Sequence, residues 1–169
     1  MDIIIFIMSK WIWLGCAALG FGILFNVPAR TLIPIFIMAI MGGSVKFLTI
    51  KLGGEIVMGS FLGATLIGFL SIIAAHLKHS PPFIFAIPAV IPMVPGVFAY
   101  RMMLGIIRMT DVGHSAFPGL LEETVSNGLN AFFVLLFLAV GVSAPMLLSR
   151  TESAKNFKLK IRTKQEQKK

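Results

Sequence analysis

The fold is decided by the stretch Ile87-Pro88-Ala89-Val90-Ile91-Pro92-Met93-Val94-Pro95-Gly96-Val97-Phe98-Ala99-Tyr100, which is almost wholly apolar yet holds three prolines and a glycine. Each proline lacks an amide N–H and clashes with a continuing helical turn, and the residue before it is pushed away from helical geometry. The segment has membrane-spanning character but cannot form one smooth helix. Broken backbone is tolerated in lipid only against protein or a water-filled cavity. The stretch is therefore either a kink that shapes helix packing or part of a transport site.

The composition predicts an all-α integral membrane protein. Of the 169 residues, 57% are hydrophobic and 13% are charged, whereas a soluble domain carries about 25% charged residues. The mean hydropathy of +0.91 agrees. The length allows four to six spans of about 20 residues each. A pocket enclosed by this chain alone would be small, which indicates a homo-oligomer or a partner.

The positive charge is concentrated at the C-terminus. The net charge is +8, and residues 150–169 hold eight basic and two acidic side chains. A basic tail of this kind is typical of the cytoplasmic side of a membrane, so we expect a membrane domain over 1–149 and a disordered cytoplasmic tail over 150–169. Phe157 is the one aromatic residue in the tail, which disfavours nucleic acid as a partner. The single cysteine, Cys16, excludes an intrachain disulfide.

Uncharged runs predict about five spans, the fourth of which is broken at Pro92–Gly96. Asn26 is a candidate cap for the first span, and Pro28 prevents its continuation. The third span carries small residues at four-residue spacing, which lets helices approach closely. The predicted spans are 3–25, 31–51, 55–76, the half-helices 83–92 and 97–109, and 122–149. The small residues of the third span are Gly59, Ser60, Gly63, Ala64 and Gly68.

Few polar side chains lie within the predicted spans. Lys46 follows Gly42 and Gly43 in the second span and either snorkels to the interface or has a function. Asn127 in the last span either bonds across helices or lines a polar path. Arg101 and Arg108 are seven residues apart, which places them two turns apart on one helix face.

The half-helix after Gly96 has a free N-terminus in this interpretation. A helix N-terminus carries a partial positive charge and free N–H donors, which favour an anion such as a carboxylate. The candidate donors are the backbone N–H groups of Val97, Phe98 and Ala99, and Tyr100 follows directly.

Histidines and glutamates outside the spans give only weak signals of chemistry. His76 and His79 are either interface residues or a pair that shares a metal. His114 with Glu122 and Glu123 suggests hydrolysis, but no His-Glu-x-x-His spacing supports it. We therefore predict no catalytic residue, metal or cofactor.

Two blocks together resemble the threonine/serine exporter family: Phe25-Asn26-Val27-Pro28-x-Arg30, and the proline block from Pro88 to Tyr100. More closely, the chain resembles the small subunit of the split, two-protein members (YjjB-like), the type associated with succinate export in enteric bacteria. Gly42-Gly43-x-x-Lys46, Asn127 and Gly141-x-Ser143-x-Pro145 also fit. The resemblance covers roughly residues 10–148.

This resemblance implies an exporter subunit for small carboxylate metabolites, either threonine and serine or succinate-like dicarboxylates. It implies a larger partner subunit and a place in the bacterial inner membrane, and the basic tail puts the C-terminus in the cytoplasm. A non-transporting membrane scaffold is the alternative function, and a membrane enzyme is the weakest of the three. The residues predicted to line the substrate path are Asn26, Arg30, Lys46, Pro92, Pro95, Gly96, Val97, Phe98, Tyr100 and Asn127.

Overall fold

The structure is a computed structural model that describes the backbone of residues 2–111 and 117–166, and the side chains of residues 11–110 and 119–149. Helices make up most of the described backbone, and no strand occurs within it. In chain order the elements are α1 (Asp2–Leu24), the short 3-10 helix η1 (Ala29–Thr31), α2 (Leu32–Lys51), α3 (Ile56–Lys78), α4 (Phe83–Val90), the 3-10 helix η2 (Ile91–Met93), α5 (Gly96–Asp111) and α6 (Phe117–Glu166).

The end of α1 confirms the predicted cap. Asn26 has a φ of 54°, the left-handed conformation that commonly ends a helix. Its N–H donates to the carbonyl of Ile23 at 2.9 Å, and the N–H of Val27 donates to that of Gly22 at 3.0 Å. These bonds satisfy carbonyls in the last turn of α1. The exposed Asn26 therefore has a backbone role in turning the chain into α2.

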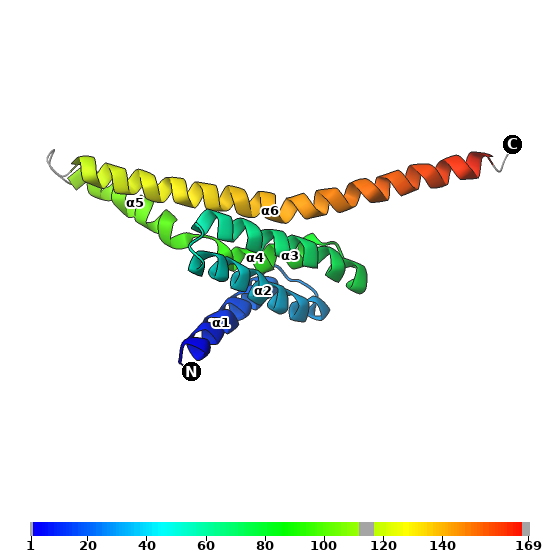
Figure 1. The fold of residues 1–169 in the computed structure, drawn as a ribbon, viewed down its shortest axis with the longest axis horizontal. Coiled ribbons are helices and arrows are strands. Elements are labelled where there is room, and N and C mark those ends of the chain that lie inside the picture. Colours follow the sequence, from blue (N-terminus) through cyan, green and yellow to red (C-terminus); the bar gives the residue numbers. More distant parts are fainter. Residues whose placement is uncertain (1, 112–116, 167–169) are drawn as a thin grey trace.

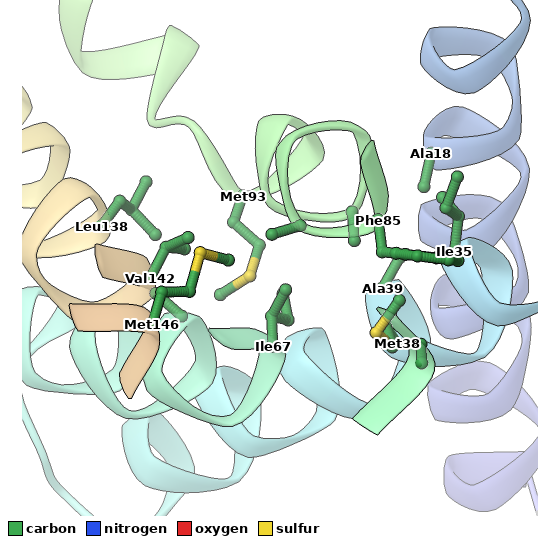
Figure 2. Close-up of a cluster of buried hydrophobic side chains, with 14 of the residues drawn as sticks. Ala18, Ile35, Met38, Ala39, Ile67, Phe85, Met93, Leu138, Val142 and Met146 are labelled. Carbon is green, nitrogen blue, oxygen red and sulfur yellow. The ribbon is translucent and has the colours of Figure 1, made fainter. Parts of the chain in front are cut away.

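The core lies where α2, α3 and α4 meet α1 and the middle of α6 (Figure 1). Phe85 of α4 and Ile35 of α2 are fully buried and lie together in Figure 2. Met93 of η2 lies between Ile67 of α3 and the side chains of α6 (Figure 2). The residue that ends the first half of the broken span is thus held in the centre of the core.

Small residues bring α3 close to both α2 and α6, as the spacing predicted. An ideal Cβ added to Gly63 would lie 2.5 Å from the carbonyl oxygen of Gly42 on α2. One added to Gly68 would lie 2.8 Å from the carbonyl oxygen of Val142 on α6. Because real Cβ atoms do not approach so closely, the backbones at these crossings require glycine.

The fourth predicted span is broken, as the proline block predicted. Helix α4 passes into η2, and α5 begins after Val94 and Pro95. The two arms, Phe83–Met93 and Gly96–Thr110, are bent by 53°. The first arm packs in the core, whereas α5 leaves it to lie along the first half of α6 (Figure 1).

Helix α6 connects three parts of the molecule. Its 50 residues make it about 75 Å long. It runs beside α5, then across α3, and then away from the core (Figure 1). It bends in the orange part of the picture, where Pro145 lies inside the helix, and proline is an expected cause of such a bend.

The helices confirm an all-α membrane protein. Over the described residues, three helices are long and apolar enough to cross a membrane, and the bent pair makes a fourth. Helix α1 spans 23 residues, although its described apolar part, Trp11–Leu24, is shorter than a full crossing. Helix α6 continues to Glu166, so its backbone extends into the basic tail, and the division into a membrane domain and a tail stays a prediction. Lysine, glutamate and glutamine favour helix, and they are frequent in this tail.

We predict that Gly63→Ala lowers the stability of the protein. The added methyl group would meet the Gly42 carbonyl oxygen and the Cε of Met93, 2.6 Å away, and overpacking costs about 1–3 kcal/mol. Thermal unfolding in detergent measures the effect. Gly20→Ala is the matched control, because Gly20 lies within α1 with nothing within 4 Å of the added carbon. An unchanged midpoint for Gly63→Ala would contradict this packing.

Candidate functional site

The side chain of Lys46 on α2 reaches the break in the fourth span. Its Nζ donates a hydrogen bond of 2.9 Å to the backbone carbonyl oxygen of Met93. Lys46 is half-buried. Two predicted site features, a lysine within a span and a proline break, therefore meet at one point in the structure.

The prolines explain why this carbonyl bonds to a side chain. In a continuous α-helix the Met93 carbonyl would accept the N–H of Val97. Pro95 has no N–H, and the chain turns here: the N–H of Val94 donates to Ile91 at 3.0 Å, and that of Gly96 donates to Val94 at 2.9 Å. The lysine ammonium thus supplies a donor to the carbonyl oxygen at the end of the first arm.

A cavity of about 230 Å³ opens beside this pair. It lies between α1, the second half of α2 and η2. Its walls are mainly aromatic and aliphatic, and Lys46 is the charged side chain among the described residues that line it. The lining consists of Trp11, Leu14, Gly43, Lys46, Phe47, Ile50, Pro92 and Met93.

Glycines near Lys46 let α2 pack closely against both α1 and α3. An added Cβ at Gly43 would collide with the Cδ2 of Leu14, and one at Gly59 would lie 2.8 Å from the carbonyl oxygen of Lys46 itself. The backbone of α2 at Lys46 is therefore packed directly against α3. Lys46 does not snorkel to the helix end in this structure, because its Nζ is bonded to the break.

The predicted anion site at the start of α5 has fewer free N–H donors in the structure than we expected. The N–H of Phe98 donates to the carbonyl oxygen of Pro95 at 3.1 Å, and that of Ala99 donates to the same oxygen at 3.4 Å. Two of the three proposed donors are therefore already bonded within the helix. Gly96 and Val97 are exposed, and a Cβ at Gly96 would meet nothing within 4 Å. Lys46 of α2, whose Nζ bonds to the end of the first arm, is the stronger cationic group.

A second, larger hollow of about 620 Å³ lies along α5 and the first half of α6. Tyr100, Arg101 and Arg108 line it from α5, and Glu123 and Thr124 line it from α6. The two arginines share one face, as their spacing predicted. Both are exposed, so this hollow is an open groove.

The remaining predicted path residues lie elsewhere. Arg30 is at the opposite end of α2 from Lys46, roughly 20 Å away along the helix, where its Nη2 donates to the Oγ of Ser80 at 3.4 Å. Asn127 is buried on α6, and its Nδ2 donates to the carbonyl oxygen of Glu123 in its own helix at 2.9 Å. This bond differs from the cross-helix bond that the sequence suggested. The predicted residues therefore lie in at least four places: the cavity with Lys46 and Pro92, the groove with Val97 and Tyr100, the contact of Arg30 with Ser80, and Asn127 on α6. That they line one substrate path stays a prediction.

Of the eight described residues that line the cavity, only Lys46 and Pro92 were predicted as site residues, and Trp11 and Met93 are among the six that were missed. Their proximity to Lys46 depends on how α1 and η2 pack, which no local pattern reveals. Counting the carbonyls that prolines leave without a helical donor would have pointed to the region of Met93.

The histidines and acidic residues noted in the sequence form no metal cluster in the described part of the chain. Within residues 11–110 and 119–149, no three histidine, cysteine, aspartate or glutamate side chains are grouped to hold a metal ion. The Nδ1 of His76 lies 2.8 Å from the carbonyl oxygen of Ile72 in its own helix. His114 lies outside the described residues.

Comparisons with known proteins agree with the resemblance. A family model described as "Threonine/Serine exporter, ThrE" matches residues 10–148. An uncharacterized protein of Haemophilus influenzae is 34% identical over 131 residues, which is 78% of this chain and 43% of the relative. The chain therefore spans less than half the length of that relative. No solved structure matches the chain.

We predict that Lys46→Met destabilises the protein. The change leaves the Met93 carbonyl without its lysine donor, and an unsatisfied buried acceptor costs about 1–3 kcal/mol. The midpoint of thermal unfolding in detergent should fall accordingly. Lys78→Met is the control, since Lys78 is exposed at the end of α3 and surface changes stay within about 0.5 kcal/mol. Equal midpoints for the two variants would show that the Lys46 bond adds nothing to stability.

Proposed function

From the threonine/serine exporter family, to which this chain belongs, we propose that it exports small carboxylate metabolites as one subunit of a two-part transporter. The chain is a multi-pass protein of a bacterial membrane. We place it in the inner membrane with the C-terminus in the cytoplasm, because the basic residues of the tail favour that side. The substrate candidates are threonine and serine or succinate-like dicarboxylates.

One observation carries the proposal: a lysine from a neighbouring helix bonds to the backbone at the break in a membrane span. Broken spans with polar backbone at their ends form the central sites of many transporters. A carboxylate needs a cation in a region of low dielectric, and Lys46 provides one beside a small cavity. A kink that served only packing would not need a charged side chain at its end.

The proposed mechanism is alternating access around this site. Lys46 attracts the carboxylate, and the apolar walls exclude bulk water. The bond between Lys46 and Met93 opens when substrate enters and closes when it leaves. Because α5 departs from the core at the break, a change at Met93 acts directly on the junction between the core and the α5–α6 pair.

A larger partner subunit completes the proposal. The matched relative is more than twice as long as the region that this chain covers, so a second subunit would supply the rest of the pathway. The open groove with Arg101 and Arg108 and the exposed apolar side chains of α5 would suit such a partner or the lipid bilayer. A scaffold without transport activity is the alternative, and reconstitution separates the two.

Reconstitution with the larger subunit is predicted to give export, and this chain alone is predicted to give none. Proteoliposomes loaded with labelled threonine, serine or succinate measure efflux with each subunit separately and with both together. Efflux of at least one compound, well above that of empty liposomes, is expected only when both subunits are present. No efflux from the pair with any of the three compounds would contradict the exporter proposal and favour the scaffold.

Pro95→Ala is predicted to reduce export by at least tenfold while the protein stays in the membrane. Alanine restores an N–H that can bond to Ile91 and continue the helix, which moves the Met93 carbonyl away from Lys46. Efflux is compared at equal membrane expression. Pro81→Ala is the matched control, since Pro81 is exposed in the α3–α4 connection. Export at the wild-type rate by Pro95→Ala would show that the break has no part in transport.

A further inference from the structure

We propose that a groove between α2 and α3, the α2–α3 groove, binds one anionic glycerophospholipid. One acyl chain lies along the groove, and the phosphate lies at Arg30 and Lys78. This site is at the opposite end of α2 from Lys46, and it goes beyond the proposed export function. It requires only that the chain lies in a membrane.

The α2–α3 groove is an apolar hollow of about 210 Å³ on the outside of the helix pair. Its floor includes the buried Met38 of α2 and Ala74 of α3. Its rims include Ile37 and Ile73, which are large and exposed. The small Ala74 beside larger neighbours gives the hollow its depth. A flexible apolar chain is the kind of ligand that fills such a space.

The α2–α3 groove runs along the two helices. Its lining extends from Pro34 to Met41 on α2 and from Leu70 to Lys78 on α3. The two helices are antiparallel neighbours, so Lys78 lies at the Pro34 end. The distance from Pro34 to Met41 is about 10 Å along the helix, which fits within one half of a hydrocarbon core about 30 Å thick. A lipid acyl chain has this direction and this depth.

Two cationic side chains lie at the outer end of the α2–α3 groove. Lys78 is exposed and lines the groove itself. Arg30 reaches the same end, because its Nη2 donates to the Oγ of Ser80 at 3.4 Å and Ser80 follows Lys78 by two residues. A guanidinium has five N–H donors, so this bond leaves others for a ligand. Arginine and lysine are the usual partners of phosphate oxygens.

The outer end of the α2–α3 groove lies on the same side of the molecule as the basic tail. Helix α6 runs parallel to α3, since Gly141 lies against Ala64 and Gly68 lies against Val142. Its C-terminal part therefore leaves the core on the side where α3 ends (Figure 1). We placed the tail on the cytoplasmic side, and basic sites between membrane helices on that side bind anionic lipid head groups.

The cationic pair lies far from the carboxylates of the described side chains. Between residues 11 and 110, Glu55 is the one acidic residue, and it precedes α3, roughly 35 Å from Lys78 along the helix. Glu122 and Glu123 are near the start of α6, which places them toward the beginning of α3. An anionic ligand would supply the counter-charge that this end of the chain lacks.

Position-resolved cross-linking tests the site. The full chain is placed in phosphatidylcholine nanodiscs that contain a small fraction of either phosphatidylglycerol or phosphatidylcholine with a diazirine on one acyl chain. Peptide mass spectrometry then maps the adducts. We expect at least fivefold more adducts in the α2–α3 groove with phosphatidylglycerol than with phosphatidylcholine. Mapping by position separates the groove from lipid that the basic tail attracts.

Variants separate the phosphate contact from the acyl contact. Lys78→Gln should lower the enrichment at least threefold, and Arg30→Gln combined with Lys78→Gln should remove it. Lys51→Gln is the matched control, because Lys51 is exposed at the opposite end of α2, and it should keep the enrichment. Ala74→Leu should lower the groove adducts at least fivefold although both cations remain. If Ala74→Leu does not fold, the charge variants still test the proposal.

Four results would each overturn the lipid site. The first two are equal groove adducts from the two lipids and enrichment that persists without Arg30 and Lys78. The third is competition by glycerol 3-phosphate, which has no acyl chain and would reveal a site for free phosphate. The fourth is a groove without adducts from either lipid, which would show that another helix or a second copy covers it. None of these results affects the two-subunit efflux assay, so this inference and the exporter proposal fail separately.

Discussion

A backbone carbonyl inside a membrane must have a donor, and this constraint organises the structure around Met93. The prolines break the fourth span, so the N–H of Val97 does not bond to the Met93 carbonyl as it would in a continuous helix, and the ammonium of Lys46 is the donor there at 2.9 Å. The side chain of Met93 is meanwhile buried in the core against α3 and α6. The end of the first arm is thus held from two sides. A kink made by proline alone would need no such charged partner, which is why we relate the break to a site.

The position of Lys46 depends on the close packing of α2 and α3. Glycines at this crossing bring the two backbones together, and that approach fixes the register of Lys46 relative to η2. The same small-residue surface of α3 continues toward α6 through Gly68. Helix packing that carries no chemistry of its own therefore determines where Lys46, the charged side chain among the described residues of the cavity, lies. Helix α6 packs against α3 in this core, whereas α5 leaves the core at the break and runs along the first part of α6. The point at which α5 diverges therefore coincides with the candidate site.

Much of the fold could be predicted from local patterns, because apolar runs, prolines and small-residue spacing act within a single helix. The five helical segments, the break and the Asn26 cap follow from such patterns. The site could be predicted only in part. Lys46 and Pro92 meet at one cavity, whereas Arg30 lies at the opposite end of α2 and Asn127 bonds within α6. Which residues meet depends on the crossing of helices far apart in sequence. We expected free N–H groups at Phe98 and Ala99, but in the structure both donate to the carbonyl oxygen of Pro95.

The positive charge of Lys46, the charged side chain among the described residues of the cavity, has an electrical consequence. Moving one charge through the membrane potential is worth about 2.3 kcal/mol per 100 mV. A zwitterion such as threonine has no net charge, so this site has the same charge when it is empty and when it is loaded. The membrane potential then acts equally on both forms and cannot drive net export through them. A dianion would reverse the sign of the loaded site and make export sensitive to voltage. With a zwitterionic substrate, the driving force must come from its own gradient or from an ion bound elsewhere in the assembly.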